Sequence, residues 1–348
     1  MEKNYQVVFT ERNKVELLEV PMPTVKAGEL LVKSVVSQIS IGTELTLLEM
    51  NVDEDSTWIK GIAGEDCDCG ATVEYPCNPG YSNVGEIIDV GEGVDRSLIG
   101  KRIMTMIPHV KYATIPVNDH IAYIAEGVDS DAAVFGTIAT ITMGSVRAAN
   151  IRAGETVVVF GAGLIGQLVA RQAQIVGAYN VIVADLSDER LALLPKDNTF
   201  IPVNTAKEDI RQVIRKCNNG KLADIVFETT SAPKLVQHEM ECIAMCGKLI
   251  ITSSPKGKSS IDFDYCSRLG ITILGAHNFM THPPVATPQN PWTQLNDAIY
   301  YQKLLAKNKI SVDGMVTHRA SYKDAVSMYK MLVADRTKAL AVHLYWED

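Results

Sequence analysis

A glycine turn between a strand and a helix carries the clearest chemistry in this sequence. Residues 156–160 are almost all apolar, residues 161–166 read G-x-G-x-x-G, and apolar residues then recur at three- and four-residue steps. A second apolar run, residues 181–184, ends on Asp185. This order predicts a strand–turn–helix–strand unit of the kind that binds a dinucleotide.

Each glycine has a physical role in that prediction. Gly161 allows the tight turn, Gly163 lets the backbone approach a pyrophosphate, and Gly166 lets the helix pack closely on the strand. Free N–H groups at the start of the helix then face the phosphates. Asp185 lies about 20 residues further on, where a carboxylate accepts hydrogen bonds from a ribose 2′-hydroxyl and repels a 2′-phosphate. The sequence therefore favours NAD over NADP.

Two other interpretations of the turn remain open. The same turn occurs in α/β domains that bind no ligand, and FAD is bound by a similar unit. FAD usually uses such a unit near a chain terminus, whereas this one begins past residue 150, which predicts a further domain in front of it. On the dinucleotide interpretation, the turn contacts the cofactor through Gly161, Gly163, Leu164, Ile165 and Gly166.

The composition is that of an ordinary soluble globular protein. Its 348 residues, 47% hydrophobic and 21% charged, are enough for two domains with a full core. The net charge of −8 argues against nucleic acid or an anionic membrane as the main partner. The start contains no signal-peptide core, no apolar run approaches about 18 residues, and the seven cysteines favour reduced thiols. We therefore expect a cytoplasmic protein without a membrane span.

The rest of the chain predicts a β-rich front, an α/β middle and a short mixed tail. Before residue 120, short β-type runs are separated by charged residues, glycine or proline. After Asp185, strands and helices alternate, including a helix over 235–245 and a strand over 271–274, which indicates a parallel, doubly wound sheet. The tail contains two helices and a strand, predicted over 293–308, 322–335 and 339–345.

This order resembles the medium-chain dehydrogenase/reductase superfamily along nearly the whole chain. The matching motifs are residues 32–44, 79–91 and 100–103 and the glycine turn. The resemblance implies an α/β fold with a GroES-like β-rich catalytic domain (1–138 and 278–348) and an inserted Rossmann domain (139–277). It also implies an active site in the cleft and a homodimer or homotetramer, with strand 271–274 in the interface.

The residues that bind catalytic zinc in alcohol dehydrogenases of that superfamily are replaced here. Ile41 stands at the cysteine position, Tyr81 at the histidine of Gly-His-Glu, and Thr137 near the third ligand. Isoleucine cannot bind a metal, and hydroxyls are poor ligands for Zn²⁺. The four-cysteine lobe of structural zinc is absent, and the C-x-C at 67–69 with Cys77 is interpreted as free thiols. We therefore expect no bound metal.

Among zinc-free members, the chain is similar to the subgroup named for a bacteriochlorophyllide dehydrogenase. The similarity lies in G-Y-S-N-V-G-E at 80–86, S-I-G-T-E at 40–44 and G-A-H at 275–277. It implies interconversion of a secondary alcohol and a ketone, a small-molecule substrate, by hydride transfer. It does not identify the alcohol.

Without zinc, a hydroxyl, a cation or a histidine must take the proton and stabilise the developing alkoxide. Thr43 matches a relay hydroxyl of the zinc enzymes, although it also fits a turn cap. Tyr81 and Ser82 match ligand positions, so they should face the cleft, where Tyr81 either polarises the substrate oxygen or fills the space of the metal. Glu44 either accepts a proton or holds a buried arginine or lysine. His109 is a weaker candidate.

Further cofactor contacts are expected at the strand ends of the Rossmann unit. Arg190 either covers the adenine face or is a solvated surface residue. Thr229 and Ser253 end predicted strands, where ligands bind in such sheets, although both also fit simple caps. His277 follows the last strand and either touches the substrate or the nicotinamide ribose, or is a surface histidine.

The sequence leaves three functions open. The leading hypothesis is a zinc-independent, NAD-linked dehydrogenase of a secondary alcohol. The second is a quinone or enone reductase, which also lacks zinc but usually favours NADPH and a basic or neutral residue in place of Asp185. The third is a dinucleotide-binding redox sensor without catalysis. The loops at 51–79 and 282–291 are expected to shape the pocket, and they carry no readable code for the substrate.

Overall fold

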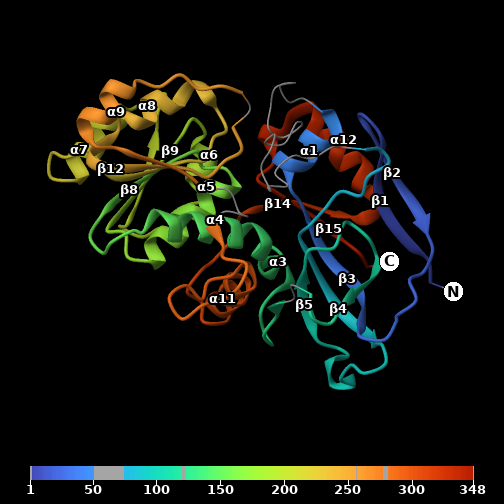
Figure 1. Ribbon diagram of the computed structural model, residues 1–348. Coiled ribbons are helices and arrows are strands. Elements are labelled where there is room, and N and C mark those ends of the chain that lie inside the picture. The colour runs from blue at the N-terminus through green and yellow to red at the C-terminus, as the bar shows by residue number, and fades with distance from the viewer. Residues whose placement is uncertain (1, 51–73, 120–121, 256, 277–280, 348) are drawn as a thin grey trace, which may run out of the picture. The chain divides into compact units, whose positions relative to one another are not determined.

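The protein divides into two compact units. The computed structural model describes residues 2–50, 74–119, 122–255, 257–276 and 281–347. Unit 1 comprises Met1–Thr137 and Ala298–Asp348, and unit 2 comprises Ile138–Asp297. Unit 1 is built on a mainly antiparallel sheet and unit 2 on a parallel sheet (Figure 1), which confirms the predicted α/β fold class.

The second boundary differs from the prediction. The first predicted boundary, between residues 138 and 139, lies one position from the one observed, whereas the second falls after Asp297 rather than after residue 277. The reason is that the segment from residue 281 onward is bonded to helix α4 (Gly136–Ala149). Asp297 pairs with Arg147 of this helix at 2.7 Å and with His282 at 3.1 Å.

Unit 2 contains six parallel strands in the order β10-β9-β8-β11-β12-β13. The order reverses between β8 and β11, and ligands of such sheets bind at the carboxyl ends of the strands beside this switch point. The strands are β8 (Thr156–Phe160), β9 (Asn180–Asp185), β10 (Phe200–Asn204), β11 (Ala223–Glu228), β12 (Ile243–Ile251) and β13 (Thr272–Gly275).

Helices lie on both faces of this sheet (Figure 1), so its central strands are buried and read as runs of valine and isoleucine. The helices are α5 (Leu164–Ile175), α6 (Asp188–Leu191), α7 (Ile210–Cys217), α8 (Val236–Met240) and α9 (Phe263–Leu269). The helix predicted over 235–245 is wrong in its length, because the chain enters β12 at Ile243, whose side chain is fully buried in the core.

Unit 1 contains a seven-stranded sheet in the order β14-β15-β3-β4-β5-β7, with β6 also paired to β3. Its strands are β3 (Glu29–Ile39), β4 (Asn83–Val90), β5 (Arg102–Thr105), β6 (Tyr112–Pro116), β7 (Ala122–Tyr123), β14 (Val316–Ser321) and β15 (Ala341–Tyr345). A hairpin of β1 (Asn4–Glu11) and β2 (Lys14–Val20) is separate from this sheet. The main helices are α1 (Ile41–Glu49), α3 (Ser130–Ala133), α11 (Gln294–Ala306) and α12 (Ala325–Asp335).

Asp131, in the first turn of α3, joins the two chain segments of unit 1. Its carboxylate accepts hydrogen bonds from the Tyr345 hydroxyl at 2.6 Å and from His343 Nδ1 at 3.2 Å. Arg319 Nε donates a third bond at 3.2 Å. Burial opposes ionisation, but the bonds from His343 and Tyr345 outweigh it and lower the pKa of Asp131 to about 2.

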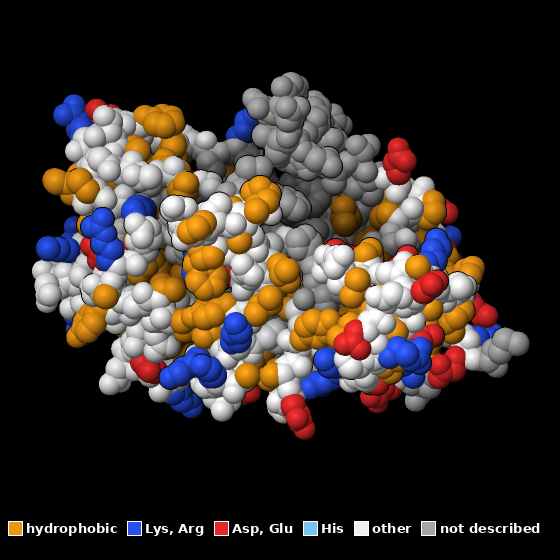
Figure 2. All heavy atoms as spheres, turned by 60° about the horizontal axis from the view of Figure 1, so that its bottom comes forward, with side chains coloured by type: hydrophobic (Ala, Val, Ile, Leu, Met, Phe, Trp, Pro, Cys, Tyr) orange, Lys and Arg blue, Asp and Glu red, His pale blue; other side chains and the backbone are white. Residues whose placement is uncertain are grey.

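The described surface gives two further observations. No helix in the described ranges is long and apolar enough to cross a membrane. On the face drawn in Figure 2, acidic and basic side chains are interspersed with hydrophobic ones, and the described residues form no continuous basic surface there.

We expect Asp131→Asn to lower the free energy of unfolding at pH 7 by about 1–3 kcal/mol, because the hydrogen bonds of a partly buried ionised group are weakened. The folded-state pKa lies below the ordinary value of 3.8. The stabilisation is therefore complete above that value and is lost as the pH falls towards about 2. Urea unfolding at several pH values measures the difference, with the exposed Asp313→Asn as control. A difference that stays constant from pH 7 to pH 2 contradicts this account.

Candidate active site

Three hydroxyl groups meet at the start of helix α1. Ser40 is the N-cap of the helix, yet its hydroxyl does not cap it, because it is hydrogen-bonded to the Tyr81 hydroxyl. Thr43, in the first turn, lies 3.3 Å from the same phenolic oxygen. The structure therefore brings together two of the predicted catalytic residues, Thr43 and Tyr81, and adds Ser40. We call Ser40, Thr43 and Tyr81 the hydroxyl cluster.

The surroundings of Tyr81 keep its phenol protonated. Burial raises the pKa of Tyr81, the hydrogen bonds from Ser40 and Thr43 oppose that rise, and the charge of Glu44 adds to it. The ring remains partly exposed. At neutral pH the cluster is therefore a chain of uncharged hydroxyls, which is able to donate a proton to an oxygen that becomes negative.

Glu44 lies behind the cluster rather than on its surface. It is 0% exposed, and its carboxylate accepts the Ser40 main-chain N–H at 2.8 Å and the Tyr329 hydroxyl. His109, also fully buried, lies 3.1 Å from the same carboxylate. The predicted interpretation of Glu44 as a holder of arginine or lysine therefore differs from the structure, in which histidine and tyrosine hold it.

Ser82 and Thr137 are buried with no partner for their hydroxyl groups among the described residues. An unpaired buried hydroxyl is unfavourable, so each of these sites suits a polar ligand or a water molecule. Ser82 directly follows Tyr81 in the chain.

The donor set around Tyr81 does not fit a zinc ion. Zn²⁺ prefers thiolate, imidazole and carboxylate, whereas the side chains that meet Tyr81 are hydroxyls, and Glu44 and His109 are bonded to each other. Within the described ranges, no group of three or more histidine, cysteine or acidic side chains is arranged to hold a metal. Cys67 and Cys69 lie outside those ranges. Cys77 is described, and burial raises the pKa of its thiol.

The glycine turn of unit 2 has the geometry that a pyrophosphate site requires. A Cβ on Gly166 would lie 1.8 Å from the carbonyl oxygen of Gly161, so helix α5 approaches the turn as closely as glycine permits. Gly161 has a φ of +99°, which also favours glycine. A Cβ on Gly163 would meet nothing within 4 Å, so the space in front of it is open. Leu164 and Ile165 begin α5 and are partly exposed.

Asp185 ends β9 beside this turn. Its carboxylate accepts the Ala162 N–H at 2.6 Å and the Ser187 N–H at 2.8 Å, one bond on each oxygen. The residue is partly exposed, and each oxygen keeps a lone pair for a ribose hydroxyl. Leu186, which follows it, is 72% exposed and offers an apolar surface next to that position. The fixed carboxylate and the open glycine turn fit the adenosine end of a dinucleotide.

The remaining predicted cofactor residues differ in whether their side chains face a possible ligand. Arg190 is partly exposed on α6, and its main-chain carbonyl accepts a bond from Gln167 at 2.7 Å. Thr229 faces inward, because its hydroxyl donates to the Phe160 carbonyl at 2.6 Å. The same hydroxyl packs against Gly161 and Gly166 of the glycine turn. Ser253 is bonded to the Glu228 carboxylate at the strand ends. His277 lies outside the described residues.

Glu228, which the sequence did not indicate as a site residue, organises this edge of the sheet. It is 1% exposed and ends β11. It accepts the Thr230 N–H at 2.6 Å, the Ser231 N–H at 2.8 Å and both the Thr230 and Ser253 hydroxyls. The signal available in the sequence was an acid at the end of an apolar run, followed by residues with hydroxyl groups.

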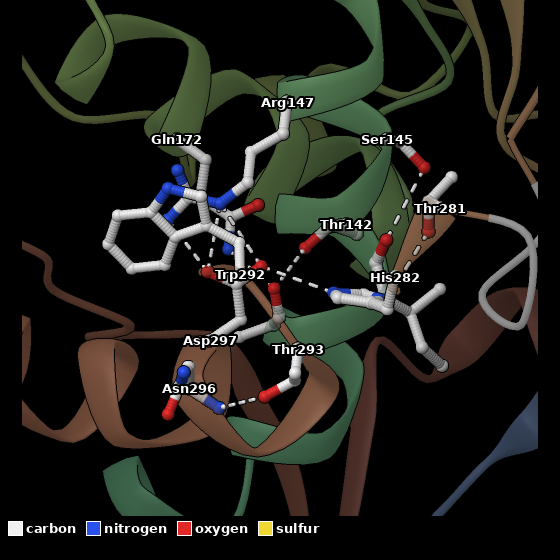
Figure 3. A network of polar contacts seen from close by, with 12 residues as sticks. Thr142, Ser145, Arg147, Gln172, Thr281, His282, Trp292, Thr293, Asn296 and Asp297 are labelled. Atoms are coloured by element: carbon white, nitrogen blue, oxygen red, sulfur yellow. Dashed lines mark hydrogen bonds and ion pairs between the residues drawn. The ribbon is translucent and has the colours of Figure 1, made fainter. Parts of the chain in front are cut away.

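The segment from residue 281 to residue 297 is fixed to α4 by the network in Figure 3. The Arg147 guanidinium lies 3.4 Å from the centre of the Trp292 ring. It also forms a bidentate pair with Asp297, from Nη2 to Oδ1 at 2.7 Å and from Nε to Oδ2 at 3.1 Å. His282 Nε2 lies 3.1 Å from Asp297 Oδ2, an oxygen that also accepts a bond from Arg147 Nε. The absence of a side chain at Gly144 makes room for Thr281 and His282. The predicted pocket-shaping loop at 282–291 therefore has both ends anchored within unit 2.

The chain is similar to known dehydrogenases over most of its length. A family model described as zinc-binding dehydrogenase matches residues 165–295. L-threonine 3-dehydrogenase of Pyrococcus abyssi is 25% identical over 339 residues, covering 87% of each chain. Sorbitol dehydrogenase 1 of Saccharomyces cerevisiae is 23% identical over 316 residues, which cover 76% of this chain and 84% of that protein. These matches support a relationship of the chain to the medium-chain, zinc-type dehydrogenase superfamily. They also support an oxidoreductase of the alcohol dehydrogenase type.

Solved structures of the same fold contain either nicotinamide cofactor. An alcohol dehydrogenase from E. coli CFT073, complexed with NADH, has a TM-score of 0.79 at 17% identity and covers 99% of this chain and 100% of that chain. A zinc-binding dehydrogenase from Sinorhizobium meliloti 1021, bound to NADP, has a TM-score of 0.78 at 18% identity, with 99% and 100% covered. They support the fold of both units.

One acid in unit 2 is buried without compensation. Glu239 of α8 is 0% exposed, and neither carboxyl oxygen has a hydrogen-bond partner among the described residues. Burial and the nearby charge of Glu228 raise the pKa of Glu239 to about 8. Glu239 is therefore neutral at pH 7.

We expect this acid to make the protein less stable as the pH rises. Between the ordinary value of 4.5 and about 8, the folded protein holds a proton that the unfolded chain has released, so stability falls across that window. Glu239→Gln keeps the shape of the neutral acid and removes the slope. We expect the variant to lie within about 1 kcal/mol of wild type at pH 5 and to exceed it at pH 9 by about 4 kcal/mol. Denaturant unfolding measures this, with the exposed Glu208→Gln as control; parallel profiles for wild type and Glu239→Gln would refute it.

Proposed function

We propose that this chain, related to the medium-chain, zinc-type dehydrogenases, is an NAD(H)-linked oxidoreductase that interconverts a secondary alcohol and its ketone without catalytic zinc. The observation that carries the proposal is the hydroxyl cluster. By the resemblance, Tyr81 stands where those enzymes place a metal ligand, and here its partners are Ser40 and Thr43. Hydroxyls exchange protons readily and bind Zn²⁺ poorly. A site built from hydroxyls also favours placing the chain in the zinc-free subgroup named for a bacteriochlorophyllide dehydrogenase.

Unit 2 holds the cofactor in this proposal. The open space at Gly163 and the free N–H groups at the start of α5 receive the pyrophosphate, and Asp185 accepts a ribose hydroxyl. Leu186 and Arg190 border the adenine. When bound, NAD accepts or supplies the hydride, and no residue of the chain changes its redox state.

The hydroxyl cluster handles the proton. Oxidation of an alcohol removes a hydride from carbon and a proton from oxygen, and reduction of a ketone requires the same proton to return. Tyr81 is protonated at neutral pH, since burial raises its pKa further above the ordinary value of 10.0. It therefore donates a hydrogen bond to the ketone oxygen and a proton to the alkoxide. The phenol regains its proton from water, and Ser40 and Thr43, which both contact its oxygen, relay that proton.

We expect wild-type protein to bind NADH more tightly than NADPH. Asp185→Ser removes the carboxylate that accepts the ribose hydroxyl and repels the 2′-phosphate. It should therefore raise the dissociation constant of NADH about tenfold or more and reduce the difference in affinity between NADH and NADPH. Fluorescence titration with each cofactor measures the dissociation constants, and melting temperature controls for the lost bonds to Ala162 and Ser187. A clear wild-type preference for NADPH would instead favour the quinone or enone reductase.

We expect Tyr81→Phe to lower kcat at least tenfold, because general acid catalysis by one group contributes about 10²-fold or more. The dissociation constant of NADH should change less than about twofold. Tyr345→Phe, which removes a tyrosine hydroxyl bonded to Asp131, is the matched control and should keep kcat. Suitable probes are L-threonine, sorbitol and 2,3-butanediol with NAD. Full turnover by Tyr81→Phe rules out the proton-donor role.

Metal analysis of the purified protein tests zinc independence. We expect turnover to persist after treatment with 1,10-phenanthroline and the zinc content to be well below one ion per chain. Stoichiometric zinc together with loss of turnover on chelation would overturn this part of the proposal. Cofactor binding without turnover of any probe would favour the non-catalytic redox sensor.

We also propose a homodimer or homotetramer formed through β13. This strand is an edge of the six-stranded sheet, and Ile273 on it is 37% exposed. Among the described residues no further strand pairs with this edge, and a sheet edge offers N–H and C=O groups to another strand. Light scattering gives the mass in solution, and a monomer would exclude the proposal.

A further inference from the structure

Glu44 and His109 form a buried pair under the hydroxyl cluster. Both have 0% exposure, and His109 Nε2 lies 3.1 and 3.3 Å from the two carboxylate oxygens of Glu44. Glu44 comes from the first turn of α1, whereas His109 comes from the connection between β5 and β6. A charged group this deep requires donors on several sides.

The direction of each hydrogen bond around the pair follows from its donors. Trp346 Nε1 only donates, so the Ser37 hydroxyl accepts its bond at 2.9 Å. The Ser37 hydroxyl also lies 2.7 Å from His109 Nδ1, and its own proton is available to that nitrogen. His109 carries its proton on Nε2 and donates it to Glu44, which also accepts the Tyr329 hydroxyl and the Ser40 N–H. In this arrangement each donor around Glu44 has a carboxylate oxygen to bond.

The pair touches both chain segments that carry the hydroxyls. The Ser40 main-chain N–H donates to Glu44 at 2.8 Å, which fixes the start of α1. On the other side, a Cβ on Gly80 would lie 2.7 Å from His109 N and 2.8 Å from its Cδ2. The Gly80 backbone, with a φ of +103°, therefore rests on the His109 ring, and Tyr81 is the next residue.

The order Ser37–His109–Glu44 is not a nucleophilic triad. Ser37 is 0% exposed, and Trp346 donates to the hydroxyl that would have to attack a substrate. A nucleophile needs access to its substrate. The group is therefore a support and does not react.

We propose that Glu44 and His109 are positioning residues that hold Ser40 and Tyr81 at hydrogen-bond distance, and that neither touches the substrate. This inference rests on the proposed function, since it explains how the hydroxyl cluster keeps its geometry. It replaces the catalytic role that the sequence suggested for Glu44. The cluster then depends on a donor at His109 Nε2 more than on other donors to the same carboxylate.

Three variants separate this role from general loss of stability. His109→Leu removes the donor to Glu44, and His109→Gln keeps an amide N–H in its place. Tyr329→Phe is the matched control, because it removes another donor from Glu44 and leaves the Ser40 bond and the Gly80 contact in place. Hydrogen exchange of the amides at 40–44 and 80–83, read by mass spectrometry, reports the position of the cluster without any substrate.

We expect His109→Leu to speed exchange at Ser40 and at residues 80–83 at least tenfold, and Tyr329→Phe to change it less than threefold. With a probe alcohol that is turned over, His109→Leu should lower kcat at least tenfold, while KM and the NADH dissociation constant stay within about threefold. His109→Gln should restore most of both effects. Where His109→Leu does not fold, Glu44→Gln, which keeps an oxygen for Ser40 N–H, serves in its place and should show the same pattern more weakly.

Equal effects of His109→Leu and Tyr329→Phe on exchange and on kcat would overturn the inference, since both would then act through stability alone. Failure of the proposed function has a different signature. Full turnover by Tyr81→Phe removes the proton role of the cluster, whereas the exchange comparison still decides whether the pair positions it.

Discussion

A carboxylate without access to water is stable only where hydrogen-bond donors surround it. Three buried glutamates of this chain satisfy this constraint in different ways. Glu44 is held by His109, Tyr329 and the Ser40 N–H, and Glu228 by two N–H groups and two hydroxyls. Glu239 has no donor among the described residues and instead keeps its proton. The two compensated acids lie where unit 1 gathers its hydroxyls and where unit 2 ends its central strands.

The same principle explains how rigid sites are made from flexible parts. Serine and threonine side chains and loop backbones have many orientations, and each must be fixed at an entropic cost. A buried anion fixes several of them at once, because every donor around it is held to one point. Glu228 fixes the Thr230–Ser231 turn to Ser253, and Glu44 fixes the start of α1. An exposed acid would exchange these partners for water.

The parts of the structure that were predictable from the sequence are those whose constraint is local. The glycine turn is one, since its three glycines are required by contacts within a single strand and helix. For example, a Cβ on Gly166 would lie 1.8 Å from the carbonyl oxygen of Gly161. The fold class followed from strand and helix periodicity. Thr43 and Tyr81 were reached through the resemblance, and the structure places their hydroxyls in one cluster.

Other features required the tertiary fold. Ser40 becomes a site residue, and His109 becomes the partner of Glu44, only because β3, α1 and the β5–β6 connection converge. They do so at separations of many residues that no local pattern records. Helix α1 was missed because nine residues with a glycine in the first turn give a weak helical signal. The second domain boundary depended on the side-chain pairing of Arg147 with Asp297, across 150 positions.

The place of β15 in unit 1 has a consequence for how the chain folds as it is made. This strand lies between β14 and β3, and Trp346, just beyond it, donates to Ser37 of β3. The front half of unit 1 therefore leaves the ribosome long before the strand that completes its sheet, whereas unit 2 is continuous in the chain. During synthesis the edge of β3 stays open for the whole time in which unit 2 is translated, and a nascent chain in that state is a natural substrate for chaperones.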